Sequence, residues 1–257
     1  MTSPTSGFQV SLTADPLVKA VTAAVRLHMS RYDGSHDFSH IRRVVGTAAY
    51  LAEHEQQQAG PSVLNLRLIT LCALLHDVGD HKYLDIDKTA SSSGDADNAD
   101  DALHALFPDP GARATAVVLR RCGAPEELVR LVPLLCQHVS WSFETKTAAS
   151  IAATADLIAR YPELAIVQDA DRLDSIGAIG IGRVFAYGAA RGGRTLQTSV
   201  DHFDDKLLHV GSRMKTATGR RLARDRTDRL HVFLQWYRDE DAVAVADPLE
   251  PVPVLKD

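Results

Sequence analysis

Cysteine is scarce in this sequence of 257 residues, which contains only Cys72, Cys122 and Cys136. Three widely spaced cysteines, an odd number, exclude the kind of disulfide framework that is found in small secreted proteins. The first ten residues, MTSPTSGFQV, also lack the basic and then apolar pattern of a signal peptide. Both absences indicate a reducing compartment, and we expect the protein to be cytoplasmic.

Long apolar runs and an excess of positive charge are lacking as well. The longest apolar run near the middle of the chain, residues 63–75, is interrupted by Asn65 and Arg67. No stretch therefore approaches the roughly 20 apolar residues that a membrane-spanning helix needs. The chain carries 28 lysines and arginines against 33 aspartates and glutamates, a formal charge of −5. Such a chain has no overall attraction for nucleic acid or for an anionic membrane, and we expect neither as a partner.

The composition is that of a globular protein, with 45% hydrophobic and 24% charged residues. Apolar residues recur at helical spacing through most of the chain, as in the face formed by Ile41, Val44, Ala48 and Ala52. No alternation of apolar and polar residues is long enough to predict a sheet. We expect an all-α fold with a single domain over residues 15–240, followed by an extended tail over residues 241–257.

Capping residues, prolines and glycines predict the ends of the helices. Asp15 before Pro16 predicts one helix start, and Ser62 after Gly60-Pro61 predicts another. Further helices are expected over residues 101–106, 112–121, 125–138 (kinked at Pro133), 162–181, 201–214 and 217–238. The glycines at 177, 180 and 182 are expected to allow close contact between helices. The polar and acidic stretch over residues 85–100 predicts a loop.

Three short strings concentrate side chains that bind metal ions. They are His36-Asp37-Phe38-Ser39-His40, Leu75-His76-Asp77-Val78-Gly79-Asp80-His81-Lys82 and Gln168-Asp169-Ala170-Asp171-Arg172-Leu173-Asp174. His76 and Asp77 end a strongly apolar helix, where a charged pair must be solvated, paired or bound to metal. The residues by themselves leave two other interpretations open, a solvated aspartate at a helix end and a buried ion pair for Asp171.

Two imidazoles and two carboxylates together form a mixed nitrogen and oxygen ligand set. This set suits Mn²⁺, Fe²⁺ or Co²⁺, and suits Mg²⁺ or Zn²⁺ less specifically. Four protein ligands on an octahedral ion leave two positions for water or for a phosphate oxygen, which is the arrangement of a hydrolytic site.

The strings HDFSHIRRV, LLHDVGDHKY and QDADRLDSIGAIGIGRVFAYG resemble the HD superfamily of metal-dependent phosphohydrolases, in its bacterial YedJ/YpgQ-like branch. The resemblance covers residues 15–240 and implies a helical HD-domain bundle with the metal ligands His40, His76, Asp77 and Asp171. It selects Asp171 over the neighbouring aspartates because the last aspartate of the family stands in an Ala-Asp-(Arg/Lys)-Leu setting. Mn²⁺ is the favoured metal, with Mg²⁺, Co²⁺, Fe²⁺, Ni²⁺ and Zn²⁺ as the other candidates.

Further roles follow from the resemblance and from position along the chain. Asp80 stands where some members of the superfamily carry a general base or acid, and Lys82 is expected to offset phosphate charge beside it. Candidate substrate contacts are His36, Arg43, His81, His138 and Lys206. Asp174 is expected to accept a hydrogen bond that orients a histidine ligand, and Asp37 to cap the following helix. The alternative for each is an ordinary surface, turn or capping role.

The resemblance implies that the substrate is a small phosphorylated metabolite. The expected reaction is that of a nucleoside triphosphate pyrophosphohydrolase, which converts a (d)NTP into a (d)NMP and pyrophosphate. A phosphomonoesterase of the 5′-nucleotidase type is the first alternative. A di-iron oxygenase, with His104 and His138 as extra ligands, and a non-catalytic nucleotide-sensing module are the others. We expect a monomer or a homodimer.

Overall fold

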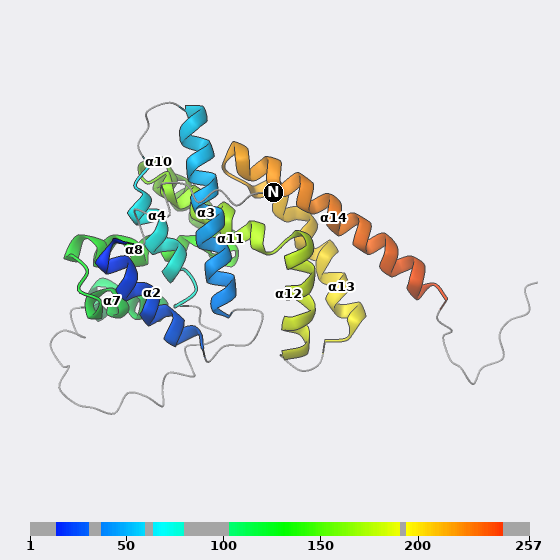
Figure 1. The fold of residues 1–257 in the computed structure, drawn as a ribbon, viewed down its shortest axis with the longest axis horizontal. Helices are drawn as coiled ribbons and strands as arrows, with labels where there is room; N and C mark the ends of the chain where they lie inside the picture. Colours follow the sequence, from blue (N-terminus) through cyan, green and yellow to red (C-terminus); the bar gives the residue numbers. More distant parts are fainter. Residues whose placement is uncertain (1–13, 31–36, 60–63, 80–102, 191–193, 244–257) are drawn as a thin grey trace, which may run out of the picture.

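The structure, a computed structural model, describes residues 14–30, 37–59, 64–79, 103–190 and 194–243. Every regular element over these residues is a helix, so the predicted all-α fold is confirmed (Figure 1). The predicted loop over residues 85–100 lies outside the described residues, as does the predicted tail beyond residue 243. Among the described helices, none combines the length and the apolar character that crossing a bilayer requires.

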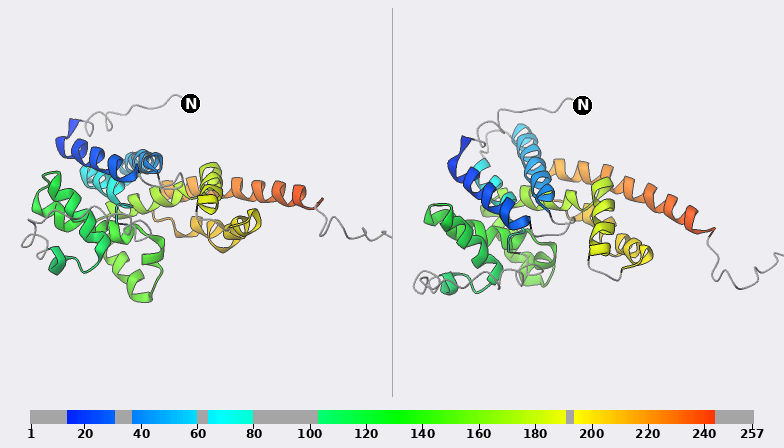
Figure 2. Two further views of the ribbon diagram at one scale, coloured as in Figure 1. Left: turned by 90° about the horizontal axis from the view of Figure 1, so that it is seen from below. Right: turned by 60° about the horizontal axis from the view of Figure 1, so that its bottom comes forward.

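The helices form two groups that are joined by one central helix. The first group contains α2 (Pro16–Met29), α3 (Phe38–Ala59), α4 (Leu66–Leu75), α7 (Pro110–Arg121), α8 (Glu126–Val139), α9 (Trp141–Glu144) and α10 (Ala148–Arg160). The second contains α12 (Gly177–Ala190), α13 (Leu196–Asp205), the 3-10 helix η2 (Leu207–Arg213) and the long α14 (Ala217–Asp241). All views in Figures 1 and 2 show α12, α13 and α14 on one side of the molecule.

The central helix is α11 (Glu163–Asp174), which packs against α3, α4, α8 and α14. Eleven of its twelve residues are buried, including charged and amide side chains such as Glu163, Gln168 and Asp169. Asp171 is the exception, because its side chain remains 27% exposed. A helix that is buried all round is normally the core of a fold, so its one partly exposed carboxylate marks a place where the core opens.

Local capping chemistry explains two of the helix starts. The Asp15 side chain accepts hydrogen bonds from the backbone N–H groups of Leu17 and Val18, and Pro16 occupies the first turn, as predicted. The prediction for α4 was wrong, because Asn65 rather than Ser62 is its N-cap. The Asn65 side chain accepts from the N–H of Leu68, which starts the helix at Leu66, three residues later than the glycine-proline signal suggested.

The single helix predicted over residues 162–181 is wrong, because the chain breaks after Asp174 into α11 and α12. Gly177 adopts a φ of +71°, a left-handed conformation that a helix interior does not contain and that glycine adopts without strain. Of the three glycines expected at helix contacts, Gly177 lies against Arg226 of α14, whereas Gly182 faces open space. Gly180 lies against the carbonyl of Ser175, close by in the chain.

The helix predicted over residues 201–214 is also wrong in its bounds and its type. The structure has α13 over Leu196–Asp205 and then a 3-10 helix over Leu207–Arg213. Helices α9 and α10 were not predicted, although Thr147 accepts a hydrogen bond from the N–H of Ser150 and so caps α10. Most of α10 is exposed and α9 has only four residues, so neither carries the apolar periodicity that identifies core helices.

Candidate metal centre

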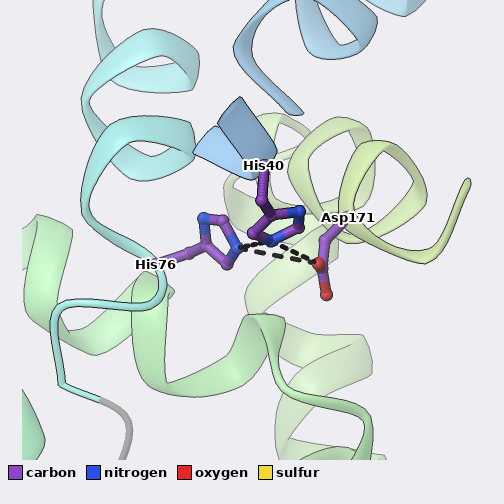
Figure 3. A group of neighbouring side chains, drawn as sticks. All are labelled: His40, His76 and Asp171. Carbon is purple, nitrogen blue, oxygen red and sulfur yellow. Dashed lines mark hydrogen bonds and ion pairs between the residues drawn. The ribbon is translucent and has the colours of Figure 1, made fainter. Parts of the chain in front are cut away.

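Three helices deliver four metal-capable side chains to one point. His40 lies in the first turn of α3, His76 and Asp77 directly follow α4, and Asp171 lies near the end of α11. Because α3, α4 and α11 pack against one another, residues that are far apart in the sequence become neighbours. Figure 3 shows the two imidazoles and the Asp171 carboxylate pointing toward one another. Asp37 caps the start of α3, the helix that carries His40, by accepting hydrogen bonds from the N–H groups of Ser39 and His40. The predicted cap is therefore confirmed.

The four side chains approach within a few ångströms. The Nε2 atom of His40 lies 3.2 Å from Nε2 of His76, 3.2 Å from Oδ2 of Asp77 and 3.5 Å from Oδ1 of Asp171. The Nε2 atom of His76 lies 3.5 Å from Oδ1 of Asp77 and 3.6 Å from Oδ1 of Asp171. Both imidazoles are nearly enclosed, with side chains 1% and 2% exposed, while the two carboxylates open toward solvent.

The other ring nitrogens show which atoms carry lone pairs. Nδ1 of His40 lies 2.7 Å from a carboxylate oxygen of Asp174, and Nδ1 of His76 lies 3.0 Å from the carbonyl oxygen of Ala73. Both partners are pure acceptors, so both Nδ1 atoms carry a proton and both Nε2 atoms face the other ligand candidates, where each can bind a further proton or a metal ion. Two lone pairs and two carboxylates that face one another within 3.6 Å repel unless a cation lies between them. The residues therefore fit a divalent metal ion.

The electrostatic field at this point is strongly negative. Burial alone would lower the pKa of His76, but the charges of Asp77 and Asp171 outweigh it and raise that pKa to about 9. Burial alone would raise the pKa of Asp171, but the neighbouring His76 and His40 imidazoles lower it. A site that attracts a proton this strongly to an enclosed imidazole also attracts a metal cation.

Asp174 holds the His40 imidazole in place from the side away from the other metal candidates. It accepts the hydrogen bond from Nδ1 of His40, a bidentate pair from Arg43 at 2.7 and 3.0 Å, and a further bond from Arg183 at 3.1 Å. Burial alone would raise the pKa of Asp174, but these partners hold it well below its usual range. The carboxylate therefore stays ionised and fixes the orientation of the His40 ring.

A cavity of about 550 Å³ opens from the cluster, and His40, His76, Asp77 and Asp171 lie in its wall. Apart from these ligand candidates, the charged wall is mostly cationic. The cationic side chains that line it are Lys146, Arg172, Arg183 and Lys206. The cavity therefore combines a negative end, suited to a metal ion, with a positive wall, suited to an anionic ligand.

The candidate substrate contacts have different surroundings. Lys206 lines the cavity, whereas Arg43 is not among its lining residues and is committed to Asp174. His138 is buried, lies 2.8 Å from the hydroxyl of Thr154 through Nδ1, and packs edge-on against Phe143 rather than lining the cavity. His36, Asp80, His81 and Lys82 lie outside the described residues, so their roles stay predictions.

The di-iron alternative required His104 or His138 as an additional ligand. His104 is exposed and His138 is bonded to Thr154, and neither lines the cavity. Within the part of the chain that the structure describes, the metal-capable group contains His40, His76 and Asp171, with Asp77 beside them. This geometry gives the alternative no support.

Several cavity residues were missed by the sequence analysis. Trp141, Phe143 and Lys146 come from the string SWSFETK, whose mixture of aromatic, hydroxyl and cationic side chains just after His138 was the available signal. Arg172 and Arg183 stand in the quoted strings but were given no role at a site, because nothing in their local sequence shows that α11 and α12 present them to a cavity.

Comparison with known proteins identifies a family and a relative that are similar to this chain. The family model described as HD domain matches residues 37–176. A protein of Bacillus subtilis strain 168 described as "Uncharacterized protein YpgQ" is 29% identical over 216 residues, which cover 78% of this chain and 82% of that protein.

Solved structures extend the comparison to the fold. Bacillus subtilis YpgQ in complex with ADP matches with a TM-score of 0.59 and 25% identity, over 87% of this chain and 97% of that one. A protein from Bacillus thuringiensis described as an HD-superfamily hydrolase matches with a TM-score of 0.55 and 26% identity, over 88% of this chain and 97% of that one.

Proposed function

Since the chain belongs to the HD domain family, we propose that it is a divalent-metal-dependent phosphohydrolase that acts on a nucleoside triphosphate. The fold is that of an HD-superfamily hydrolase. The proposed reaction converts a (d)NTP into a (d)NMP and pyrophosphate. The observation that carries the proposal is the convergence of His40, His76, Asp77 and Asp171 at one end of a cavity whose remaining charged wall is mostly cationic.

The four converging side chains would hold the metal. Two imidazole nitrogens and two carboxylate oxygens would suit Mn²⁺, which is the metal we propose. When bound, such an ion supplies Lewis acidity for a phosphoryl oxygen and lowers the pKa of a water molecule. Asp174 keeps the His40 ring in the tautomer that this role needs.

The cationic wall would hold the phosphate groups. Arg172 of α11, Arg183 of α12 and Lys206 between α13 and η2 line the cavity, and they would offset the charge of a transferring phosphoryl group. The ADP complex of the Bacillus subtilis relative supports a nucleotide as the ligand class. Asp80 is proposed to accept a proton from the attacking water, and Lys82 to stabilise the phosphate beside it.

A hydrolysis screen of metals against substrates tests the proposal. Purified protein is assayed with Mn²⁺, Mg²⁺, Co²⁺, Ni²⁺ and Zn²⁺ against nucleoside tri-, di- and monophosphates, and both pyrophosphate and orthophosphate are measured. We expect manganese-dependent release of pyrophosphate from at least one triphosphate, and a loss of at least about 100-fold in His76→Ala. Release of orthophosphate instead would favour the 5′-nucleotidase type, and no turnover of any phosphate compound would contradict the hydrolase proposal.

A further inference from the structure

Three cationic side chains surround the indole ring of Trp141. The guanidinium carbons of Arg172 and Arg213 lie 5.5 and 5.8 Å from the ring centroid, and Nζ of Lys206 lies 6.0 Å from it. Significant cation–π contacts occur about once in 70–80 residues of a typical protein, so three at one ring are a concentrated feature. We refer to Trp141, Arg172, Lys206 and Arg213 as the Trp141 cluster.

The Trp141 cluster is held in place by a buried carboxylate. Glu144, whose side chain is 2% exposed, accepts a close hydrogen bond from Arg172 and another from Nζ of Lys215 at 2.6 Å. Arg172 also donates to the backbone carbonyl of Arg213 at 2.9 Å. Four cationic side chains thus meet around one indole and one carboxylate, a balance that leaves the group positively charged.

The cluster lies in the same cavity as the metal candidates. Trp141, Arg172 and Lys206 line the cavity wall, and Arg172 directly follows Asp171 on α11. Like charges held against one ring repel one another, and an anion bound beside them in the cavity would offset that repulsion. The cavity therefore has two separate places for a phosphate group, one at the metal candidates and one at this cluster.

We propose that the Trp141 cluster binds the phosphates of an oligophosphate chain that lie away from the metal, and so selects chains of linked phosphates over a single phosphate. This inference rests on the proposed function for the identity of the reaction. The anion binding that it describes can be measured without any hydrolysis. Trp141 acts as a positioning residue, because its ring restrains the cations before the ligand arrives and so lowers the entropy lost on binding.

Calorimetric titration with inorganic tripolyphosphate and orthophosphate tests the proposal without any chemical step. The full chain is titrated with each anion at low and at moderate salt, in buffer freed of divalent metal. We expect tripolyphosphate to bind at least about tenfold more tightly than orthophosphate, and we expect its affinity to fall as the salt concentration rises. Equal affinity for the two anions would overturn the proposal.

Two variants locate the site. Arg213→Gln removes an exposed cation beside the indole, and we expect it to weaken tripolyphosphate binding about fivefold with less effect on orthophosphate. Trp141→Leu removes the ring and should have a similar effect, while Trp141→Phe should retain most of the affinity. Arg224→Gln, an exposed arginine of α14, is the matched control and should bind both anions like wild type. Unchanged tripolyphosphate binding in both Arg213→Gln and Trp141→Leu contradicts the assignment.

Fluorescence provides a readout that a merely structural role would not move. The chain has two tryptophans, and Trp236 is exposed on α14, so Trp236→Phe leaves Trp141 as the sole tryptophan. We expect tripolyphosphate to change the emission of this variant with the same affinity that calorimetry gives, and orthophosphate to change it less. Constant emission at saturating tripolyphosphate overturns the proposal.

The results separate this inference from the proposed function. Tight, Arg213-dependent binding with no hydrolysis in any metal would retain the binding site and reject the enzyme. Hydrolysis of a triphosphate with unchanged kcat/KM in Arg213→Gln and Trp141→Leu would retain the enzyme and reject the cluster.

Discussion

At the scale of single residues, the metal candidates depend on partners that only accept hydrogen bonds. The carboxylate of Asp174 and the carbonyl of Ala73 hold the Nδ1 protons of His40 and His76, which leaves both Nε2 atoms aimed at one point, where a metal ion would displace any proton that they bind. The same carboxylate binds Arg43 and Arg183, so it connects α3, α11 and α12. One side chain thereby sets the orientation and the tautomer of His40 and compensates the charge of two guanidinium groups.

Replacing Asp174 by Asn tests this arrangement. The amide has one acceptor oxygen and no charge, so it leaves the His40 ring less restrained and two guanidinium groups less compensated. We expect affinity for Mn²⁺ to fall about 10- to 100-fold, measured by calorimetric titration. Asp156→Asn, an exposed position on α10, is the control and should bind Mn²⁺ like wild type. Wild-type affinity in Asp174→Asn would show that the His40 orientation does not depend on this carboxylate.

His138 predicts a pH dependence of stability. Burial lowers its pKa below the ordinary value of 6.5, although the charge of Glu144 opposes this, so the folded state binds this proton less readily than the unfolded state. The stabilising contribution is therefore complete above pH 6.5 and is lost as the pH falls through the folded-state pKa. His138→Gln lacks this titration, so its deficit in free energy of unfolding relative to wild type should shrink between pH 8 and pH 5 in urea denaturation. A deficit that is constant with pH would contradict the assignment.

At the scale of elements, the turn that follows α4 and contains Asp77 is held by a close backbone contact with the start of α7. A Cβ atom on Gly79 would lie 2.5 Å from the carbonyl oxygen of Gly111, and a Cβ on Gly111 would lie 2.2 Å from the carbonyl oxygen of Gly79. Only two residues without side chains allow the two backbones to come this close. The ends of α4 and α7 therefore meet beside the cavity, whose wall includes both glycines.

Gly79→Ala is expected to separate these backbones. The clash involves main-chain atoms that cannot rotate away, so we expect a loss of about 1–3 kcal/mol in free energy of unfolding. The shift of the turn should also weaken Mn²⁺ binding. Gly182→Ala is the control, because its Cβ would meet nothing within 4 Å inside α12. That variant should gain about 0.5–1 kcal/mol from lower chain entropy in the unfolded state. Equal stability of the two variants would refute the close-contact explanation.

At the scale of the whole molecule, the metal candidates connect segments that are distant in the sequence. His40, the pair His76 and Asp77, and Asp171 belong to α3, to the end of α4 and to α11, and these three helices pack together. Asp169, two residues before Asp171, accepts from the N–H groups of Lys215 and Thr216 and so fixes the start of α14. The central helix thus carries a metal candidate and also holds the start of the second group's long helix, and Figure 1 shows α11 between the two groups of helices.

This arrangement predicts that bound Mn²⁺ raises the free energy of unfolding of the whole fold. An ion that binds only when three distant segments are assembled binds the folded state alone. At 100 times its dissociation constant it should add about 2.7 kcal/mol to the free energy of unfolding, which thermal unfolding detects as a rise in Tm. His76→Ala should show no such rise, and an equal rise in that variant would place the ion elsewhere.

The helical class, the strings that carry the metal candidates and the cap at Asp15 could all be predicted from the order of the residues. Periodic apolar residues determine which face of a helix is buried, and capping side chains act on neighbours within three residues, so both are written locally. The same local rules failed where a distant contact decided the outcome. The break at Gly177 beside Arg226 is an example.

The surroundings of the metal candidates, and the partners of the charged residues near them, could be seen only in the folded chain. The tertiary structure committed Arg43 to Asp174, buried His138 against Thr154 and brought Trp141, Arg172 and Lys206 into one cavity. The physical reason is that the choice between a solvated, a paired and a ligand-facing charge depends on the elements that surround it. Those elements are set by the packing of α11 against its neighbours, which no local pattern of residues encodes.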